Sequence, residues 1–166
     1  IFIELADSLK KRKDLGFIFV GRGSEVDKLK KLSANKQLDN NLFFDEINPE
    51  EIPSLLKMCH IGLLSLDLRH KSHNIPGKFL TYLQAGLPVL AKVNFGTDLQ
   101  YIIENEKVGT VYTDNKVNDL RILAEKVIDD NKNYKFMSVQ CQSLYNRMFS
   151  TTKITNQIIS SLSDHM

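Results

Sequence analysis

The residues best suited to chemistry lie in one polar and basic stretch. It reads Ser72-His73-Asn74-Ile75-Pro76-Gly77-Lys78-Phe79-Leu80-Thr81-Tyr82. Pro76 suits the start of a helix because its ring fixes φ, and Gly77 lets a ligand come close to the backbone. The first-turn amides, those of Gly77, Lys78 and Phe79, would then point at an anion. The stretch therefore predicts a site for a phosphate or diphosphate at the start of a helix.

Side chains around this turn could complete such a site. A charge-assisted bond from Lys78 or Arg69 would hold a diphosphate more firmly than helix amides alone. Thr81 and Tyr82, three and four residues after Lys78, should share its helix face. The alternative is that Pro-Gly simply starts a helix and Lys78 is solvated. The density of His, Arg, Lys and Asn favours a functional loop.

Two other turns are weaker candidates. Gly21-Arg22-Gly23-Ser24 lacks the third glycine of a dinucleotide-binding fingerprint. It is either a tight turn or a site in which Arg22 meets a phosphate or a base. The segment 94–98 could contact a substrate, but capping of the next helix is favoured. His70 and His73 lack a third strong metal ligand, so we expect hydrogen bonding to a substrate and no metal.

The elements around these turns alternate between strand and helix, which indicates a parallel sheet with helices on its faces. Ser24 and Asn48 are the expected N-caps of two of the helices. The expected strands are 17–20, 42–44, 61–66, 88–91 and 109–112. The expected helices are 1–14, 24–34, 49–58, 76–85, 97–105, 117–130, 132–148 and 151–162.

We therefore predict an α/β fold: one Rossmann-like domain over residues 1–166, with a helical C-terminal tail. The chain opens on a helix without an initiator Met, so we expect a fragment of a longer protein that lacks its first strand. That strand is usually central in a doubly wound sheet. The sheet should then have a gap that an unseen segment or a partner fills.

Composition narrows the function classes. Hydrophobic residues make up 42% and charged residues 25%, as in ordinary globular proteins. Lys and Arg total 22 against 20 Asp and Glu, which gives no support for nucleic-acid binding. No apolar run is long enough to span a membrane. The basic run 10–13 should end the first helix, where cations are favourable; attraction to a membrane surface is the alternative.

The two cysteines indicate the redox state of the protein's cellular compartment. Cys59 and Cys141 lie far apart and match no metal-ligand spacing. We expect no secretory signal. The cysteines predict reduced thiols in a cytoplasmic protein.

Three stretches resemble family 4 glycosyltransferases over roughly residues 1–130. Val20-Gly21-Arg22-Gly23-Ser24-Glu25 resembles the family's V-G-x-G-x-E segment, and residues 43–53 resemble its next strand and helix. The most specific stretch, residues 76–91, is similar to the family's P-S/G-K-x-x-E-Y-x-x-A-G-x-P-V-x-A. The sequence of Ser72–Phe79 most resembles the corresponding sequences of bacterial transferases of O-antigen or capsule assembly, of the fucosamine-transferase type.

The resemblance implies the C-terminal, donor-binding half of a two-domain GT-B enzyme. Such an enzyme would move a sugar from a nucleotide diphosphate with retained stereochemistry, without a metal or another cofactor. Gly77 and Lys78 would lie near the diphosphate. The family's two glutamates, eight residues apart, become His73 and Thr81 here, which puts the ribose contact in doubt.

The resemblance and the residue pattern together give one set of donor-binding candidates. These are Arg22, Gly23, His73, Asn74, Ile75, Pro76, Gly77, Lys78, Phe79, Thr81 and Tyr82. Catalytic residues on the acceptor side should belong to a domain outside this chain, so the fragment alone is expected to be inactive.

The expected partners are a nucleotide-sugar donor and, through that other domain, a lipid-linked or saccharide acceptor. The whole enzyme should work in the cytoplasm, with peripheral association at the inner face of the membrane. Two other functions stay open: a GT-B sugar-nucleotide epimerase, which needs carboxylate acid and base groups near the sugar, and a non-catalytic α/β nucleotide-binding module.

Overall fold

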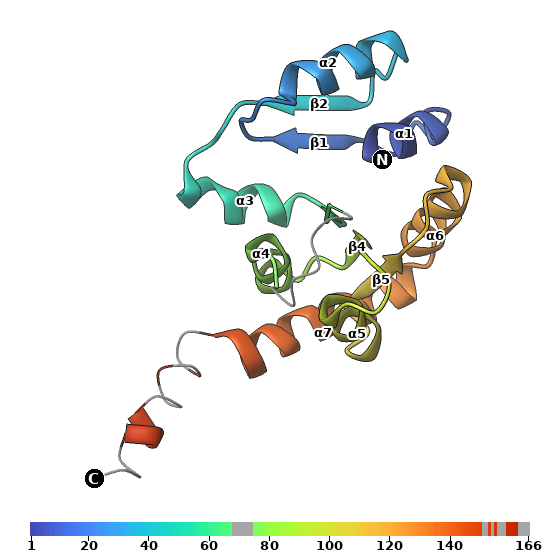
Figure 1. The fold of residues 1–166 in the computed structure, drawn as a ribbon. Helices are drawn as coiled ribbons and strands as arrows, with labels where there is room; N and C mark the ends of the chain where they lie inside the picture. Colours follow the sequence, from blue (N-terminus) through green and yellow to red (C-terminus); the bar gives the residue numbers. More distant parts are fainter. Residues whose placement is uncertain (68–74, 151–152, 154, 156–158, 163–166) are drawn as a thin grey trace. The chain divides into compact units, whose positions relative to one another are not determined.

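The computed structural model describes residues 1–67, 75–150, 153, 155 and 159–162 (Figure 1). The described chain divides into two compact units. The first contains residues 1–55 and 115–125, and the second contains residues 56–114 and 126–166. Each unit is described by itself below.

The first unit contains a short parallel sheet. Strands β1 (Phe17–Val20) and β2 (Asn41–Phe44) pair in parallel, with Phe19 opposite Phe43. The rings of Phe19 and Phe43 stack with their centroids 4.9 Å apart. The sheet is accompanied by helices α1 (Phe2–Ser8) and α2 (Val26–Asn35). On α1, Ile3, Leu5 and Ala6 are buried.

An ion-pair cluster ties the first helix to the residue that follows the second. The Lys36 Nζ lies 3.0 Å from Glu4 Oε2 and 2.9 Å from Asp7 Oδ2. Hydrogen bonding to these carboxylates raises the pKa of Lys36, and Lys36 and Lys10 lower the pKa of Asp7. Two sequence expectations are wrong here. Helix α1 ends at Ser8, so the basic run 10–13 is not in its last turn. The N-cap of α2 is Glu25 rather than Ser24, without a side-chain cap bond.

The predicted cap at Asn48 is confirmed. Its side chain accepts a hydrogen bond from the Glu50 amide, and the Glu51 carboxylate accepts one from the Asn48 amide. This capping box starts the 3₁₀ turn η1 (Pro49–Glu51), which continues into α3 (Ile52–Lys57). Helix α6 (Val117–Asp129) follows later in the chain.

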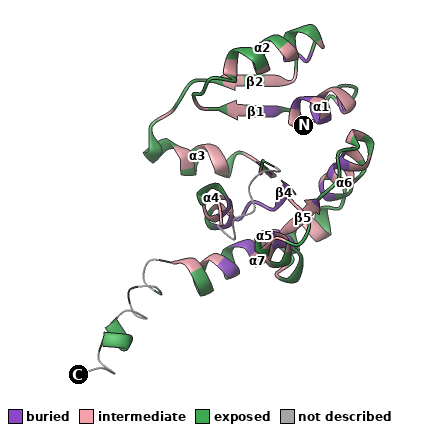
Figure 2. Cartoon of the chain, viewed as in Figure 1, coloured by how far each residue is buried: buried purple, intermediate pink, exposed green. Residues whose placement is uncertain are grey.

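The second unit is built on three parallel strands in the order β3-β4-β5. They are β3 (Gly62–Ser65), β4 (Val89–Lys92) and β5 (Gly109–Tyr112). Every residue of the middle strand β4 is buried (Figure 2), as expected for a parallel strand covered on both faces. Helices α4 (Gly77–Ala85), α5 (Asp98–Asn105) and α7 (Asn131–Leu144) complete the unit, and α7 runs on into a π-helical turn, η2 (Tyr145–Phe149).

One apolar core holds these helices to the sheet. Alternate residues of β3 and β4 point to one face, where they meet the inner faces of α4, α5 and α7. The buried members of this core are Leu64, Phe79, Leu83, Val89, Ala91, Val93, Leu99, Ile103, Val108, Cys141 and Leu144. The core fixes α4 against the sheet and thereby fixes the position of its first turn.

The predicted fold class, parallel strands flanked by helices with a helical C-terminal region, is confirmed. The described strands form two ladders, β1-β2 and β3-β4-β5. The single domain over residues 1–166 stays a prediction.

Cys59 and Cys141 form no disulfide with each other. Cys141 lies in the core, with its Sγ 3.4 Å from the carbonyl oxygens of Leu87 and Val108. Burial raises its pKa to about 12. No helix in the described part of the chain has the length and apolarity to cross a membrane.

Candidate functional site at the start of helix α4

Helix α4 begins where the sequence predicts it, on the carboxyl side of the β3-β4-β5 sheet. Its N-cap is Pro76, in the extended conformation, with no side-chain cap bond. The Phe79 amide donates to the Pro76 carbonyl at 2.9 Å. The amides of Gly77 and Lys78 have no partner among the described residues, and both residues are exposed. A Cβ at Gly77 would meet nothing within 4 Å, so the space beside this backbone is open.

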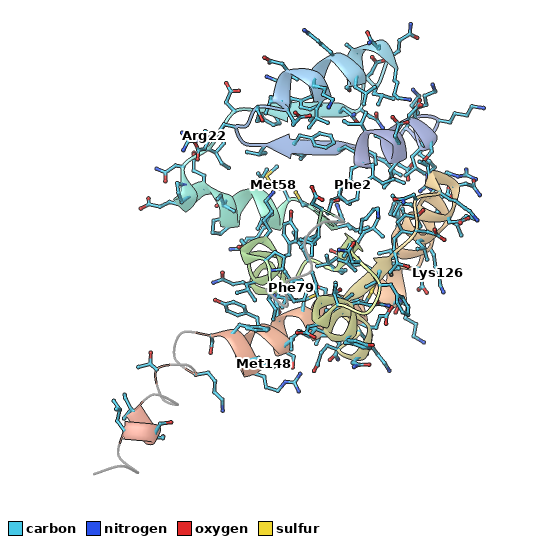
Figure 3. The ribbon with its side chains drawn as sticks, viewed as in Figure 1. Phe2, Arg22, Met58, Phe79, Lys126 and Met148 are labelled. Atoms are coloured by element: carbon cyan, nitrogen blue, oxygen red, sulfur yellow. The ribbon has the colours of Figure 1, made fainter. Side chains whose placement is uncertain are left out.

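Two of the predicted site residues serve the core instead. The Phe79 side chain is fully buried between α4 and the sheet (Figure 3), and its amide is taken by Pro76, so only two of the three expected amides remain available. Ile75 is half-buried and packs against the same core. Helical period explains this difference, because Phe79 follows Lys78 by one residue and therefore points about 100° away from it.

Tyr82 also faces the sheet, which corrects the expectation that it shares an exposed face with Lys78. Its ring covers Gly62, where a Cβ would come within 2.5 Å of the ring. Its hydroxyl donates to the Leu63 carbonyl at 3.2 Å. Burial raises the pKa of the Tyr82 hydroxyl. Tyr82 therefore positions α4 on β3.

Thr81 is half-buried, and its Oγ1 donates to the Gly77 carbonyl at 3.1 Å. The hydroxyl proton is thus committed to the helix backbone, while its lone pairs can still accept a hydrogen bond. The other two candidates in this stretch, His73 and Asn74, lie outside the described residues. The structure therefore brings Pro76, Gly77, Lys78 and Thr81 together along the first turn of α4.

Arg22 and Gly23 belong to the other compact unit, so they are described separately. Both follow the carboxyl end of β1. The Arg22 guanidinium projects into solvent (Figure 3), with 84% of its side chain exposed, and its Nε lies 3.0 Å from Glu46 Oε2. Glu46 follows β2, the neighbouring strand. A phosphate that bound Arg22 would compete with this carboxylate, a partner that the sequence analysis did not anticipate.

The third turn acts as a helix cap, as the sequence analysis favoured. The Thr97 Oγ1 accepts from the Gln100 amide at 3.4 Å and donates to the Asn94 carbonyl at 3.1 Å. In the described residues, no group of three or more His, Cys, Asp or Glu side chains could hold a metal ion.

One charged residue beside these turns was missed. Lys92 ends β4 and is only 6% exposed, with no hydrogen-bond partner for its Nζ among the described residues. The signal was present in the sequence: Val89, Leu90 and Ala91 form an apolar strand that needs cover on both faces, and the next residue in that strand is a lysine.

Comparison with known proteins identifies the family. Residues 1–141 match the family described as Glycosyl transferases group 1. The chain belongs to this family. Over 104 residues it is 27% identical to the "Probable glycosyltransferase WbjE" of Pseudomonas aeruginosa, a match that covers 63% of this chain and 26% of WbjE. The chain thus spans about a quarter of that relative's length.

Solved structures of known proteins share the fold. WaaG, a glycosyltransferase involved in lipopolysaccharide biosynthesis, superposes with a TM-score of 0.70 at 19% identity, over 89% of this chain and 39% of WaaG. TarM of S. aureus, crystallised with UDP among its ligands, gives 0.75 at 18% identity, over 96% of this chain and 31% of TarM.

A third structure is a separate domain. The C-terminal domain of LpcC, a group 1 glycosyltransferase of Francisella tularensis, gives a TM-score of 0.71 at 20% identity, over 90% of this chain and 78% of that domain. The predicted resemblance to the C-terminal half of GT-B enzymes is therefore confirmed at the level of fold and family.

Proposed function

We propose that this chain is the donor-binding part of a group 1 glycosyltransferase, and that the start of α4 holds the diphosphate of a nucleotide sugar. The observation that carries the proposal is the open first turn of α4. The amides of Gly77 and Lys78 have no partner among the described residues, and the Lys78 side chain is exposed next to them. Helix N-termini with free amides favour anions, and a nearby ammonium strengthens the contact.

The charge distribution along the chain supports the same site. Residues 68–97 lie between Asp67, which follows β3, and Asp98, which begins α5, and they include helix α4 and strand β4. They contain Arg69, Lys71, Lys78 and Lys92 but no Asp or Glu, although the whole chain has 20 acidic residues. Segments that join strands to helices meet at the carboxyl edge of a parallel sheet, where ligands bind. A stretch with a net positive charge favours a polyanionic ligand such as a nucleoside diphosphate.

These groups would stabilise the leaving group of the reaction. When the sugar leaves, negative charge grows on the terminal phosphate of the nucleoside diphosphate. Fixed amides and an ammonium aimed at that phosphate stabilise the developing charge more than the starting state, and this lowers the barrier. We expect the Gly77 and Lys78 amides and the Lys78 ammonium to fill this role without a metal. His73, Asn74, Thr81 and, from the other unit, Arg22 and Gly23 remain proposed donor contacts.

The acceptor, the stereochemistry and the place of action are properties of the whole enzyme. WaaG is involved in lipopolysaccharide biosynthesis, and this supports a bacterial enzyme that adds a sugar to an O-antigen or capsule acceptor. We propose retention of stereochemistry, a cytoplasmic site of action at the inner face of the membrane, and acceptor residues on a second domain. In this view residues 1–166 form one domain.

Removal of the Lys78 charge tests the site. We expect Lys78→Ala to weaken binding of nucleoside diphosphates by about tenfold or more, since a hydrogen bond to a charged group contributes about 1.5–3 kcal/mol. The fold should survive because the side chain is exposed. Isothermal titration of UDP and GDP into both chains measures the change.

The matched control is Lys135→Ala, which removes an exposed lysine from α7 in the same unit. It should bind nucleotide like the unmodified chain. Equal affinity of the Lys78→Ala chain and the unmodified chain would remove the diphosphate site from α4.

A further inference from the structure

Lys92 stands at the point of the sheet where a ligand would approach. It is the last residue of β4, the middle strand of three, and ligands of open parallel sheets bind beyond the carboxyl ends of the strands. Its register partners are Ser65 on β3 and Tyr112 on β5. Because side chains alternate along a strand, Lys92 points to the face opposite Ala91 and Val93, and therefore away from the apolar core.

The ammonium of Lys92 is buried without a counter-charge. The residue is 6% exposed, and its Nζ has no hydrogen-bond partner among the described residues. The nearest recorded interaction is with the Tyr112 ring, whose centroid lies 5.9 Å from the Nζ. A cation over a ring at that distance recovers only part of what an ammonium loses when it leaves water. A buried charge is normally paired or hydrogen-bonded, so we expect the Lys92 ammonium to bind an anion.

The residues on either side of Lys92 in the sequence do not supply that anion. Residues 68–97 contain no Asp or Glu, and the Lys92 Nζ has no hydrogen-bond partner among the described residues. Ser65, the register partner on β3, is uncharged. No acidic side chain of residues 68–97 can therefore pair with Lys92.

We propose that Lys92 binds an oxyanion of the donor substrate, as a second cationic contact in addition to Lys78. The proposal rests on the donor-binding function proposed above. The oxyanion is either a phosphoryl oxygen, present in every nucleotide sugar, or a carboxylate on the transferred sugar. Because the Nζ is buried against the Tyr112 ring, the flexible four-carbon stem of Lys92 turns toward the ligand on binding. In the free chain the Lys92 ammonium is thus poorly compensated, and the bound donor supplies the anion that compensates it.

The decisive variant is Lys92→Met, which keeps the stem length and removes the charge, with Lys92→Gln as a second neutral variant. Thermal unfolding of the free chains should show Lys92→Met as stable as the unmodified chain or more stable, because an unpaired buried charge is lost. Titration should show the opposite effect on the donor, an affinity loss of at least tenfold. A merely structural lysine would not give these two opposite results. Lys135→Met on α7 is the control and should change neither quantity.

A ligand series identifies the oxyanion. The chains are titrated with nucleoside, nucleoside diphosphate, a neutral-sugar nucleotide and a uronate-sugar nucleotide. A loss that begins at the diphosphate supports a phosphoryl contact, and a loss confined to the uronate donor supports a carboxylate contact. Equal affinities of Lys92→Met and unmodified chains for all four ligands, or a Lys92→Met chain that is less stable than the unmodified one, would overturn this inference alone. An unmodified chain that binds no nucleoside diphosphate would overturn the proposed function as well.

Discussion

Gly109→Ala should prevent the second unit from folding stably. Gly109 begins β5 directly opposite Val89 of β4. A Cβ added at Gly109 would overlap the Val89 backbone, its carbonyl oxygen first and then its carbonyl carbon and nitrogen. Neither strand can retreat, because the Val89 amide is bonded to the Val108 carbonyl at 3.0 Å and β4 is buried along its whole length. We expect a loss of more than about 3 kcal/mol, above the usual cost of an overpacked core.

Urea unfolding followed by circular dichroism measures this loss. Gly77→Ala is the matched control, because a Cβ there meets nothing within 4 Å and Gly77 is the first residue of α4. That substitution should be neutral or stabilising by up to about 1 kcal/mol. If Gly109→Ala unfolded at the same urea concentration as Gly77→Ala, the pairing of β4 with β5 described here would be wrong.

Phe79→Ala should destabilise the chain by about 3–5 kcal/mol, the usual cost of removing a buried aromatic side chain. Phe79 is fully buried in the core that joins α4 to β3, β4 and α7. The truncation leaves a cavity beneath the first turn of α4, so the position of the proposed diphosphate site is lost together with stability. Thermal unfolding of the variant gives the change directly.

Phe79→Leu separates packing from ligand contact. It keeps most of the apolar volume, so it should recover more than half of the lost stability and restore nucleotide binding. A Phe79→Leu chain that is stable but binds no nucleotide would instead show that the ring itself touches the donor, against its placement in the core.

The sequence is sufficient to predict most of the fold. Apolar runs such as Phe17–Val20 and Val89–Ala91 predict strands within a residue of their observed bounds. Strand β4 is buried on both faces, as expected of a parallel strand, whereas Ile18 and Val20 of β1 are exposed. Helix starts with a cap or a proline, at Asn48, Pro76 and Thr97, are also predicted correctly. The expected cap at Ser24 is wrong, since the turn after Gly23 runs on to Glu25 before the helix begins.

The candidate site is harder to predict, because tertiary contacts decide what each side chain does. Spacing places Tyr82 one turn from Lys78, but the absence of a side chain at Gly62 lets the Tyr82 ring lie on β3. Arg22 meets Glu46 only because β1 and β2 are neighbours, which periodicity does not reveal. Lys92 is likewise buried by tertiary structure that the sequence pattern does not reveal.

The amides at the start of α4 carry the proposed diphosphate site, and nuclear magnetic resonance can observe them one by one. Nucleoside diphosphate is titrated into the isotopically labelled chain, with the bare nucleoside as the reference. We predict that the amide resonances of Gly77 and Lys78 shift more than those of any other residue in α4, that both saturate at one dissociation constant, and that the nucleoside alone moves them little. Resonances of Gly77 and Lys78 that stay in place while the diphosphate binds elsewhere, or that stay in place because nothing binds, would contradict the account.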